Sequence, residues 1–236
     1  MQALVRGLKI NYIIIGEGNP LLILHGWGSN KEKWQKVAEI LSQKGFKVVV
    51  LDLPGFGESQ EPDLIWDLDE YALFINEFAK SLGLQSFNLL GHSFGGAVAS
   101  KYALKYPEKI NKLFLVGAAC IRKEKAKRKL FKVLSIFKFI PFARRFFYRF
   151  IVKSDYPQTK GIMRDIYLKC IKEDLSDELE KITAPTIIIW GEKDDITPLS
   201  QAKLINSKIK NSKLFIIPNQ GHALQLTAHK ELCSYI

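Results

Sequence analysis

A serine occupies the centre of residues 91–95, whose sequence GHSFG has the pattern G-x-S-x-G. The apolar residues 87–90 before it predict a buried strand, and residues 96–104 after it predict a helix. A serine on a tight turn between a strand and a helix has its hydroxyl exposed above the sheet. We expect the flanking glycines to be required, because a side chain there would collide with the neighbouring strand or helix. In this context the pentapeptide indicates that Ser93 is a nucleophile.

Short apolar segments alternate with segments of helical spacing along the rest of the chain. The predicted strands cover residues 4–15 (two short strands), 21–24, 47–51, 87–90, 112–116, 186–190 and 213–217. The predicted helices cover residues 32–43, 68–82, 96–104, 199–206 and 224–236. This alternation predicts the α/β fold class, with a mostly parallel β-sheet and helices on both faces. The ligand site of such a sheet lies beyond the carboxyl ends of its strands.

A base and an acid are needed to activate the serine, because a serine hydroxyl alone is a poor nucleophile. His222, directly after the last predicted strand, is the candidate base, and we expect Gly221 to let its loop approach Ser93. The alternative for His222 is a loop histidine with a structural hydrogen bond. Asp194 is the candidate acid, because it comes first after the turn that ends the preceding strand. Asp195 is the rival, and its other role would be to cap the helix that follows.

Two backbone amides are candidates for stabilising the oxygen anion of a tetrahedral intermediate. One is the N–H of Phe94, immediately after the nucleophile, and the other is the N–H of Trp27, in the glycine-containing loop 25–28. The Trp27 side chain either lines the substrate pocket or only packs against its neighbours.

Five motifs in this order resemble those of the α/β-hydrolase superfamily, in its serine-nucleophile branch of esterases and lipases. They are HGWG at 25–28, DLPGFGES at 52–59, GHSFGG at 91–96, the G-x-x-D-x-x-x-P pattern at 191–198, and GH at 221–222. The chain order Ser93, Asp194, His222 is also the order of that family. The resemblance covers about residues 5–118 and 180–230. It implies that His25 and Asp52 organise the loops at the site and are not members of the triad.

The resemblance also implies how the chain is divided. The α/β-hydrolase core would comprise residues 1–117 and 184–236, and a small helical lid would be inserted at residues 118–183.

One segment of this insert carries the whole net charge of +11. Residues 118–160 hold thirteen Lys and Arg residues against two acidic residues, whereas the two signs balance elsewhere. Residues 122–140 and 142–153 have the spacing of amphipathic helices. We expect a lid that covers the pocket with its apolar face, and a second hypothesis is weak association with anionic membrane surfaces. The expected pocket residues are Trp27, Phe137, Phe146 and Phe147.

Composition argues against several other classes of protein. No run of about 18 apolar residues is present, so no membrane-spanning helix is expected. Three widely spaced cysteines argue against a disulfide framework and for a reducing compartment. Scattered histidines and the absence of C-x-x-C argue against a metal site. With no signal-peptide pattern and no nucleic-acid motif, we expect a cytoplasmic enzyme without metal, cofactor or nucleic-acid partner.

The expected reaction is hydrolysis of carboxylic esters of small or medium apolar substrates through an acyl-enzyme. Lactone hydrolysis, thioester hydrolysis and carbon–carbon bond cleavage on the same triad stay open as alternatives. A ligand-binding member of the fold without catalysis is the alternative from another class. The sequence leaves the natural substrate and the oligomeric state open.

Overall fold

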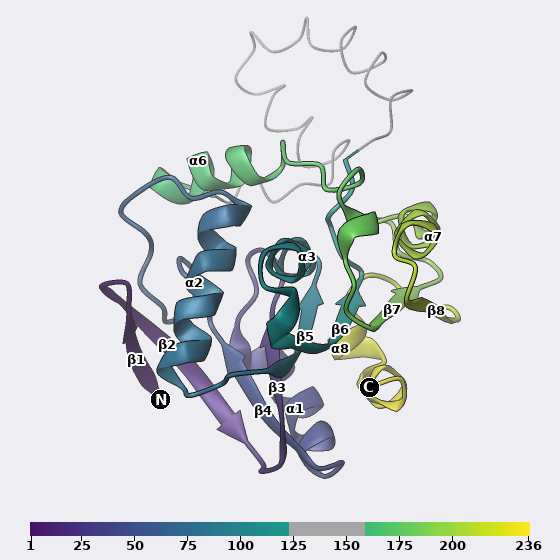
Figure 1. Cartoon of the computed structure of the whole chain (residues 1–236), viewed down its shortest axis with the longest axis horizontal. Coiled ribbons are helices and arrows are strands. Elements are labelled where there is room, and N and C mark those ends of the chain that lie inside the picture. The colour runs from purple at the N-terminus through teal and green to yellow at the C-terminus, as the bar shows by residue number, and fades with distance from the viewer. Residues whose placement is uncertain (123–158) are drawn as a thin grey trace, which may run out of the picture.

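The computed structural model describes residues 1–122 and 159–236, which form an eight-stranded sheet in the order β1-β2-β4-β3-β5-β6-β7-β8 (Figure 1). The strands are β1 (Gln2–Val5), β2 (Leu8–Ile15), β3 (Asn19–Leu24), β4 (Phe46–Leu51), β5 (Phe87–His92), β6 (Ile110–Val116), β7 (Thr186–Gly191) and β8 (Ser212–Ile217). Strands β3 to β8 are parallel to one another, whereas β2 pairs antiparallel with both β1 and β4 at one edge. The predicted fold class is confirmed.

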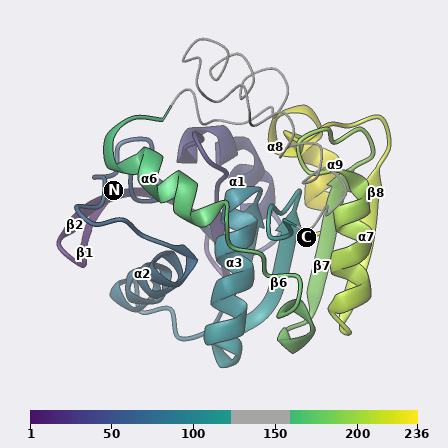
Figure 2. The same ribbon diagram turned by 90° about the horizontal axis from the view of Figure 1, so that it is seen from above.

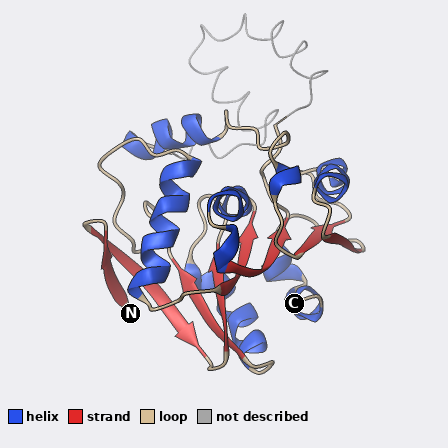
Figure 3. Cartoon of the chain, in the orientation of Figure 1, coloured by secondary structure: helices blue, strands red, loops and turns tan. Residues whose placement is uncertain are grey.

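Helices cover both faces of this sheet (Figure 3). On one face lie α2 (Leu68–Ser81), α3 (Phe94–Lys105) and α7 (Leu199–Lys208), and on the other lie α1 (Gln35–Ser42), α8 (Leu224–Thr227) and α9 (His229–Ser234). Short 3₁₀ turns are η1 (Lys31–Trp34), η2 (Pro107–Lys109) and η6 (Leu179–Lys181).

The two-residue repeat of a strand distributes its side chains between two cores. In β3 all four of residues 21–24 are fully buried. Leu22 and Leu24 join the apolar cluster beneath α2 and α3, whereas Leu21 and Ile23 join the cluster beneath α1 and α9. A strand covered on both faces therefore needs an uninterrupted apolar run, which is the pattern that revealed it in the sequence.

The last predicted helix, residues 224–236, is wrong as a single element. The structure has two short helices there, because the backbone of Ala228 leaves the helical region with φ of −141° and ψ of 36°. The break lets Leu224, Leu232 and Cys233 all pack in the cluster beneath α1. The first predicted helix begins with the 3₁₀ turn η1, and its Ile40 is only half-buried.

One further helix, α6 (Gly161–Cys170), lies across the end of the sheet toward which the arrows of β5 and β6 point (Figures 1 and 2). Its buried side carries Met163, Ile166 and Cys170. A Cβ atom on Gly55 would lie 2.2 Å from the sulfur of Met163, so the helix rests directly on the loop after β4. The Lys169 ammonium pairs with the Asp67 carboxylate at 3.0 Å. This salt bridge and the apolar contacts of the buried side together hold α6 against the core.

The two predicted amphipathic helices at 122–140 and 142–153 lie outside the described residues, apart from Arg122. So do three of the predicted pocket residues, Phe137, Phe146 and Phe147. Their roles, and the association of this basic segment with anionic membranes, stay predictions. No helix within residues 1–122 and 159–236 combines the length and apolar character needed to cross a bilayer. The cysteines, Cys120, Cys170 and Cys233, are buried and free.

Close packing at the end of β7 depends on a different glycine from the one the sequence suggested. A Cβ atom on Gly191 would lie 2.2 Å from the carbonyl oxygen of Gly221 and 2.5 Å from that of Gln220. A Cβ atom on Gly221 would have only the Lys193 carbonyl oxygen nearby, at 4.0 Å. The close approach of the His222 loop to the end of β7 therefore requires Gly191. The expectation was that Gly221 lets this loop approach Ser93, and the space around position 221 does not require a glycine there.

We predict that Gly191→Ala lowers the free energy of unfolding by about 1–3 kcal/mol, because the new methyl group overpacks the contact. Gly221→Ala is the matched control on the other side of the same contact. It should leave stability unchanged or slightly higher, within about 1 kcal/mol, because the methyl group meets open space. Urea unfolding of both variants measures the difference, and equal losses would contradict the assignment.

Candidate active site

Ser93 sits on a strained turn between β5 and α3. Its φ of 53° lies in the left-handed region, which non-glycine residues seldom adopt. The turn is so tight that a Cβ atom on Gly91 would lie 2.3 Å from the carbonyl oxygen of Gly95. The Ser93 N–H donates to the Val116 carbonyl at 3.0 Å, which ties the turn to β6. The side chain is half-buried at the N-terminus of α3, where a reacting group can reach it.

Gly95 brings the start of α3 against the loop after β3. A Cβ atom on Gly95 would lie 2.3 Å from the Leu24 carbonyl oxygen and 2.6 Å from that of His25. This contact of backbone on backbone places the loop that holds Trp27 beside the N-terminus of α3. Within the described part of the chain, the backbone N–H groups of Trp27 and Phe94 donate to no other residue. Both predicted oxyanion donors therefore remain available to a ligand.

The Trp27 ring packs edge-on against three other aromatic rings. The centroid distances are 4.8 Å to Phe56, 5.0 Å to Phe94 and 4.9 Å to Tyr167 of α6. The Trp27 side chain therefore packs against its neighbours, which is one of the two roles considered for it. Its role in lining a substrate pocket stays a prediction. The ring remains half-buried, so these aromatic groups form an apolar surface next to the loop.

Asp194 and His222 form a hydrogen-bonded pair, with Nδ1 of the histidine 2.7 Å from Oδ2 of the aspartate. The carboxylate also accepts from the N–H groups of Ile196 and Thr197 at Oδ1, and from the Thr197 hydroxyl at Oδ2. Burial alone would raise the pKa of the Asp194 carboxyl. The hydrogen bonds from His222 and Thr197 outweigh that effect and lower the pKa below its ordinary value. The carboxylate is therefore ionised and fixed in orientation.

The rival acid, Asp195, is exposed and lies outside this pair. Its alternative role was to cap the helix that follows. That helix, α7, begins after Pro198, and the capping role of Asp195 stays a prediction. The structure thus brings Asp194 to His222, as the preferred prediction requires.

Ser93 and the His222–Asp194 pair both lie against the turn after β6. A Cβ atom on Gly117 would lie 3.1 Å from Cε1 of His222 and 3.4 Å from Oδ2 of Asp194. On the same turn, the carbonyl of Val116 accepts from the Ser93 N–H, and the Ser93 carbonyl accepts from Ala119 at 2.9 Å. The ends of β5, β7 and β8 therefore bring Ser93 and the His222–Asp194 pair to the same turn, and their joint action as a triad stays a prediction.

His25 joins the loops after β3 and β4. Its Nε2 accepts from the Leu53 N–H at 3.0 Å, so the proton lies on Nδ1, which donates to the Gly26 carbonyl at 2.8 Å. Complete burial lowers its pKa to about 4, and the ring is neutral. Both ring nitrogens are engaged in holding loops, which agrees with the organising role that the family resemblance implies.

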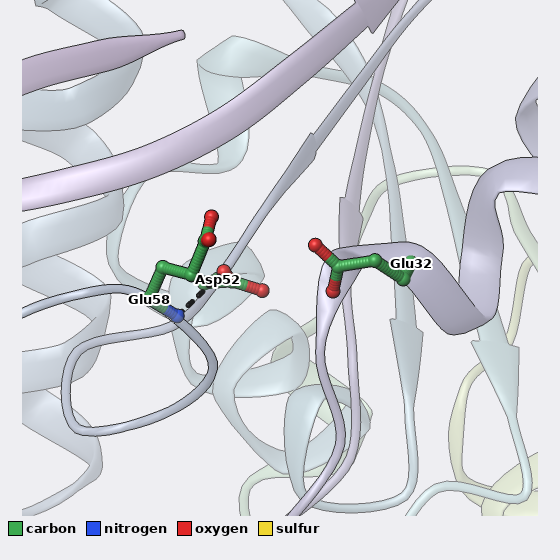
Figure 4. Close-up of side chains that lie close together, drawn as sticks. All are labelled: Glu32, Asp52 and Glu58. Atoms are coloured by element: carbon green, nitrogen blue, oxygen red, sulfur yellow. Dashed lines mark hydrogen bonds between the residues drawn. The ribbon is translucent and has the colours of Figure 1, made fainter.

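Asp52 holds the neighbouring turns together from a fully buried position. Its Oδ1 accepts from the Lys31 backbone N–H, and its Oδ2 accepts from the Lys31 ammonium and from the Glu58 N–H. Figure 4 shows the carboxyl groups of Glu32, Asp52 and Glu58 close together, an arrangement that could hold a metal ion. The Lys31 ammonium lies 2.7–2.8 Å from an oxygen of each of them. A cation of the chain itself thus bridges all three carboxylates, and we do not assign a metal to the cluster.

Two residues beside the triad received no role from the sequence, although both lie inside recognised motifs. Thr197, three residues after Asp194, donates its hydroxyl to Asp194 and lies 3.2 Å from Nδ1 of His222. His92, directly before Ser93, contacts the carbonyl of His222. Nothing in the sequence marks these contacts, because each partner is fixed only by the tertiary fold.

The lowered pKa of Asp194 has a consequence for stability at different pH values. A carboxyl whose folded pKa is lowered stabilises the fold fully above its ordinary pKa of about 4, and this contribution is lost as the pH falls through the folded pKa. Asp194→Asn should therefore destabilise the chain at neutral pH and progressively less below about pH 4. Urea unfolding across a pH series tests this, with the exposed neighbour variant Asp195→Asn as control. A penalty for Asp194→Asn that stays constant over the series would contradict the prediction.

Comparisons with known proteins agree with this geometry. A family model described as alpha/beta hydrolase fold matches residues 19–135. The alpha/beta hydrolase superfamily protein YisY of Bacillus subtilis is 30% identical, over 88% of this chain and 86% of its own. The pimeloyl-(acyl-carrier protein) methyl ester esterase of Vibrio parahaemolyticus is 29% identical, over 97% and 96%. The solved structure of an esterase from Exiguobacterium antarcticum superposes with a TM-score of 0.80 at 26% identity, over 99% of this chain and 96% of that one. The chain belongs to the alpha/beta hydrolase family.

Proposed function

We propose that this protein hydrolyses carboxylic esters through an acyl-enzyme on Ser93. The observation that carries the proposal is the 2.7 Å bond between His222 and the buried Asp194, beside the strained turn that presents the serine. The names of two relatives, the Vibrio methyl ester esterase and the Exiguobacterium esterase, support ester cleavage as the reaction.

The proposed reaction proceeds in two halves. The Ser93 hydroxyl attacks the ester carbonyl while Nε2 of His222 takes its proton, and the N–H groups of Trp27 and Phe94 stabilise the oxyanion. The imidazolium then gives the proton to the leaving alcohol, and the acyl group stays on Ser93. A water molecule attacks this acyl-enzyme with His222 as base again, which releases the carboxylic acid and restores the serine.

Asp194 orients the base and stabilises its transient charge. Because Asp194 is hydrogen-bonded at both oxygens, its carboxylate holds Nδ1 of His222 as the donor, which leaves Nε2 free for the serine proton. The charge of the imidazolium develops next to a carboxylate that needs no reorganisation.

The aromatic groups around Trp27 support an apolar acyl or alcohol part of small or medium size. The rings of Phe56, Phe94 and Tyr167 surround the loop that carries one oxyanion donor. The same nucleophile and base would also act on lactones and thioesters, and no feature of the described residues favours these over simple esters.

We predict that the wild-type chain is labelled by a fluorophosphonate probe and releases p-nitrophenol from p-nitrophenyl esters, whereas Ser93→Ala does neither and remains folded. Asp194→Asn should lower kcat on the order of 10⁴-fold, because the histidine then adopts the wrong tautomer. Asp195→Asn, at the exposed neighbouring position, should retain kcat.

A series of p-nitrophenyl esters from acetate to palmitate then reports the size of the acyl site. We expect kcat/KM to be highest for short and medium chains and to fall for long ones. A wild-type chain that is neither labelled nor active would contradict the proposal and favour a ligand-binding role, and full activity of Ser93→Ala would exclude the mechanism.

A further inference from the structure

The side chain of His92 lies between the loop of the oxyanion donor and the loop of the base. His92 is buried, and its Nε2 lies 3.0 Å from the backbone carbonyl oxygen of His222. At its other edge, Nδ1 lies 3.1 Å from the point where a Cβ atom on Gly26 would be. The imidazole thus spans the distance between the loops after β3 and β8, directly beneath the nucleophile that follows it in the chain.

The rings on either side hold His92 in its plane. Its centroid is 4.8 Å from that of His222 and 5.6 Å from that of the fully buried Trp34. A Cβ atom on Gly26 would also lie 3.1 Å from the Cβ of Ser93, so Gly26 touches both the ring and the nucleophile. The imidazole therefore contacts both the loop after β3 and the loop after β8.

The hydrogen bond fixes the tautomer of His92. A carbonyl oxygen only accepts, so Nε2 of His92 carries the proton and donates it to His222. Nδ1 is buried and has no hydrogen-bond partner among the described residues. Burial, together with the nearby His222, lowers the pKa of His92 to about 3, and the ring stays neutral. A neutral ring adds no repulsion when the adjacent base takes up a proton.

We propose that His92 is a positioning residue that sets His222 relative to Ser93 and the oxyanion loop. The inference rests on the proposed function. Asp194 and Thr197 both contact His222 at Nδ1 of its ring, and neither contact is to the backbone of His222. The bond from His92 to the His222 carbonyl supplies a second fixed point, on the backbone. Two points together define where Nε2 of the base lies.

Two variants separate the hydrogen bond from the packing of the ring. His92→Phe keeps a planar ring and loses the donor, whereas His92→Gln loses the ring and keeps an N–H donor at a similar reach. We expect His92→Phe to lower kcat about tenfold with little change in KM, because misplacement of the base weakens the transition state. His92→Gln should recover most of that loss. The measurements are kcat and KM for a p-nitrophenyl ester, per active site titrated with fluorophosphonate, together with Tm.

The split between kcat and KM and the rescue by His92→Gln are the readouts that a purely structural role would not move. The pH profile tests whether His92 itself titrates during the reaction. Because His92 is neutral, the ratio of wild-type to His92→Phe kcat should be the same at every pH. Wild-type kcat in His92→Phe, or a loss in His92→Gln as large as in His92→Phe, would overturn the positioning role. A wild-type chain without turnover or labelling would instead overturn the proposed function, so the two failures are distinguishable.

Discussion

The site depends on the close packing of backbone segments around Ser93. Gly91, Gly95 and Gly96 each lie where a Cβ atom would come within 2.5 Å of a neighbour. Only with hydrogen in place of a side chain can β5, α3 and the loop after β3 approach so closely. This approach holds Ser93 in its left-handed conformation and sets Phe94 beside the oxyanion loop. The strain of one residue is thus maintained by the packing of several elements.

Buried charge holds the adjoining loops in a second way. Asp52 is fully buried, and its carboxylate is satisfied by the Lys31 ammonium and by two backbone N–H groups. Removing one partner from such a group is costly, because the other is left as an uncompensated buried charge. A Cβ atom on Gly57 would lie 2.3 Å from Cγ of Asp52, so the loop after β4 is wrapped tightly on it. The charge of Asp52 thus helps to hold the geometry of these loops.

The sheet and the pairing of Asp194 with His222 could be predicted from the sequence, because both follow from local patterns. Apolar runs such as residues 21–24 mark strands buried on two faces, and Ser93, Asp194 and His222 each come after such a run. The break at Ala228 was missed, because the local spacing of residues 224–236 is helical throughout and only packing under α1 interrupts it.

Contacts between loops could not be predicted in the same way. His92 and the carbonyl that it binds are 130 positions apart, and no periodic pattern connects them. The glycine at the close contact between β7 and the His222 loop shows the same limit. Gly221 is adjacent to His222 in the sequence, but Gly191 is the residue where a Cβ atom would collide with that loop.

The environments of three histidines explain why only one of them is suited to catalysis. His25 and His92 are both buried, which lowers the pKa of each far enough to keep the ring neutral. His25 is bound at both ring nitrogens, and His92 donates its one proton to a carbonyl. His222 is the one of the three whose ring is paired with a carboxylate, and its side chain is 17% exposed. In the proposed mechanism, His222 is therefore the favourable acceptor, among these three histidines, for a proton taken from Ser93. The imidazoles of His25 and His92 are buried and connect loops, whereas Asp194 is hydrogen-bonded to His222.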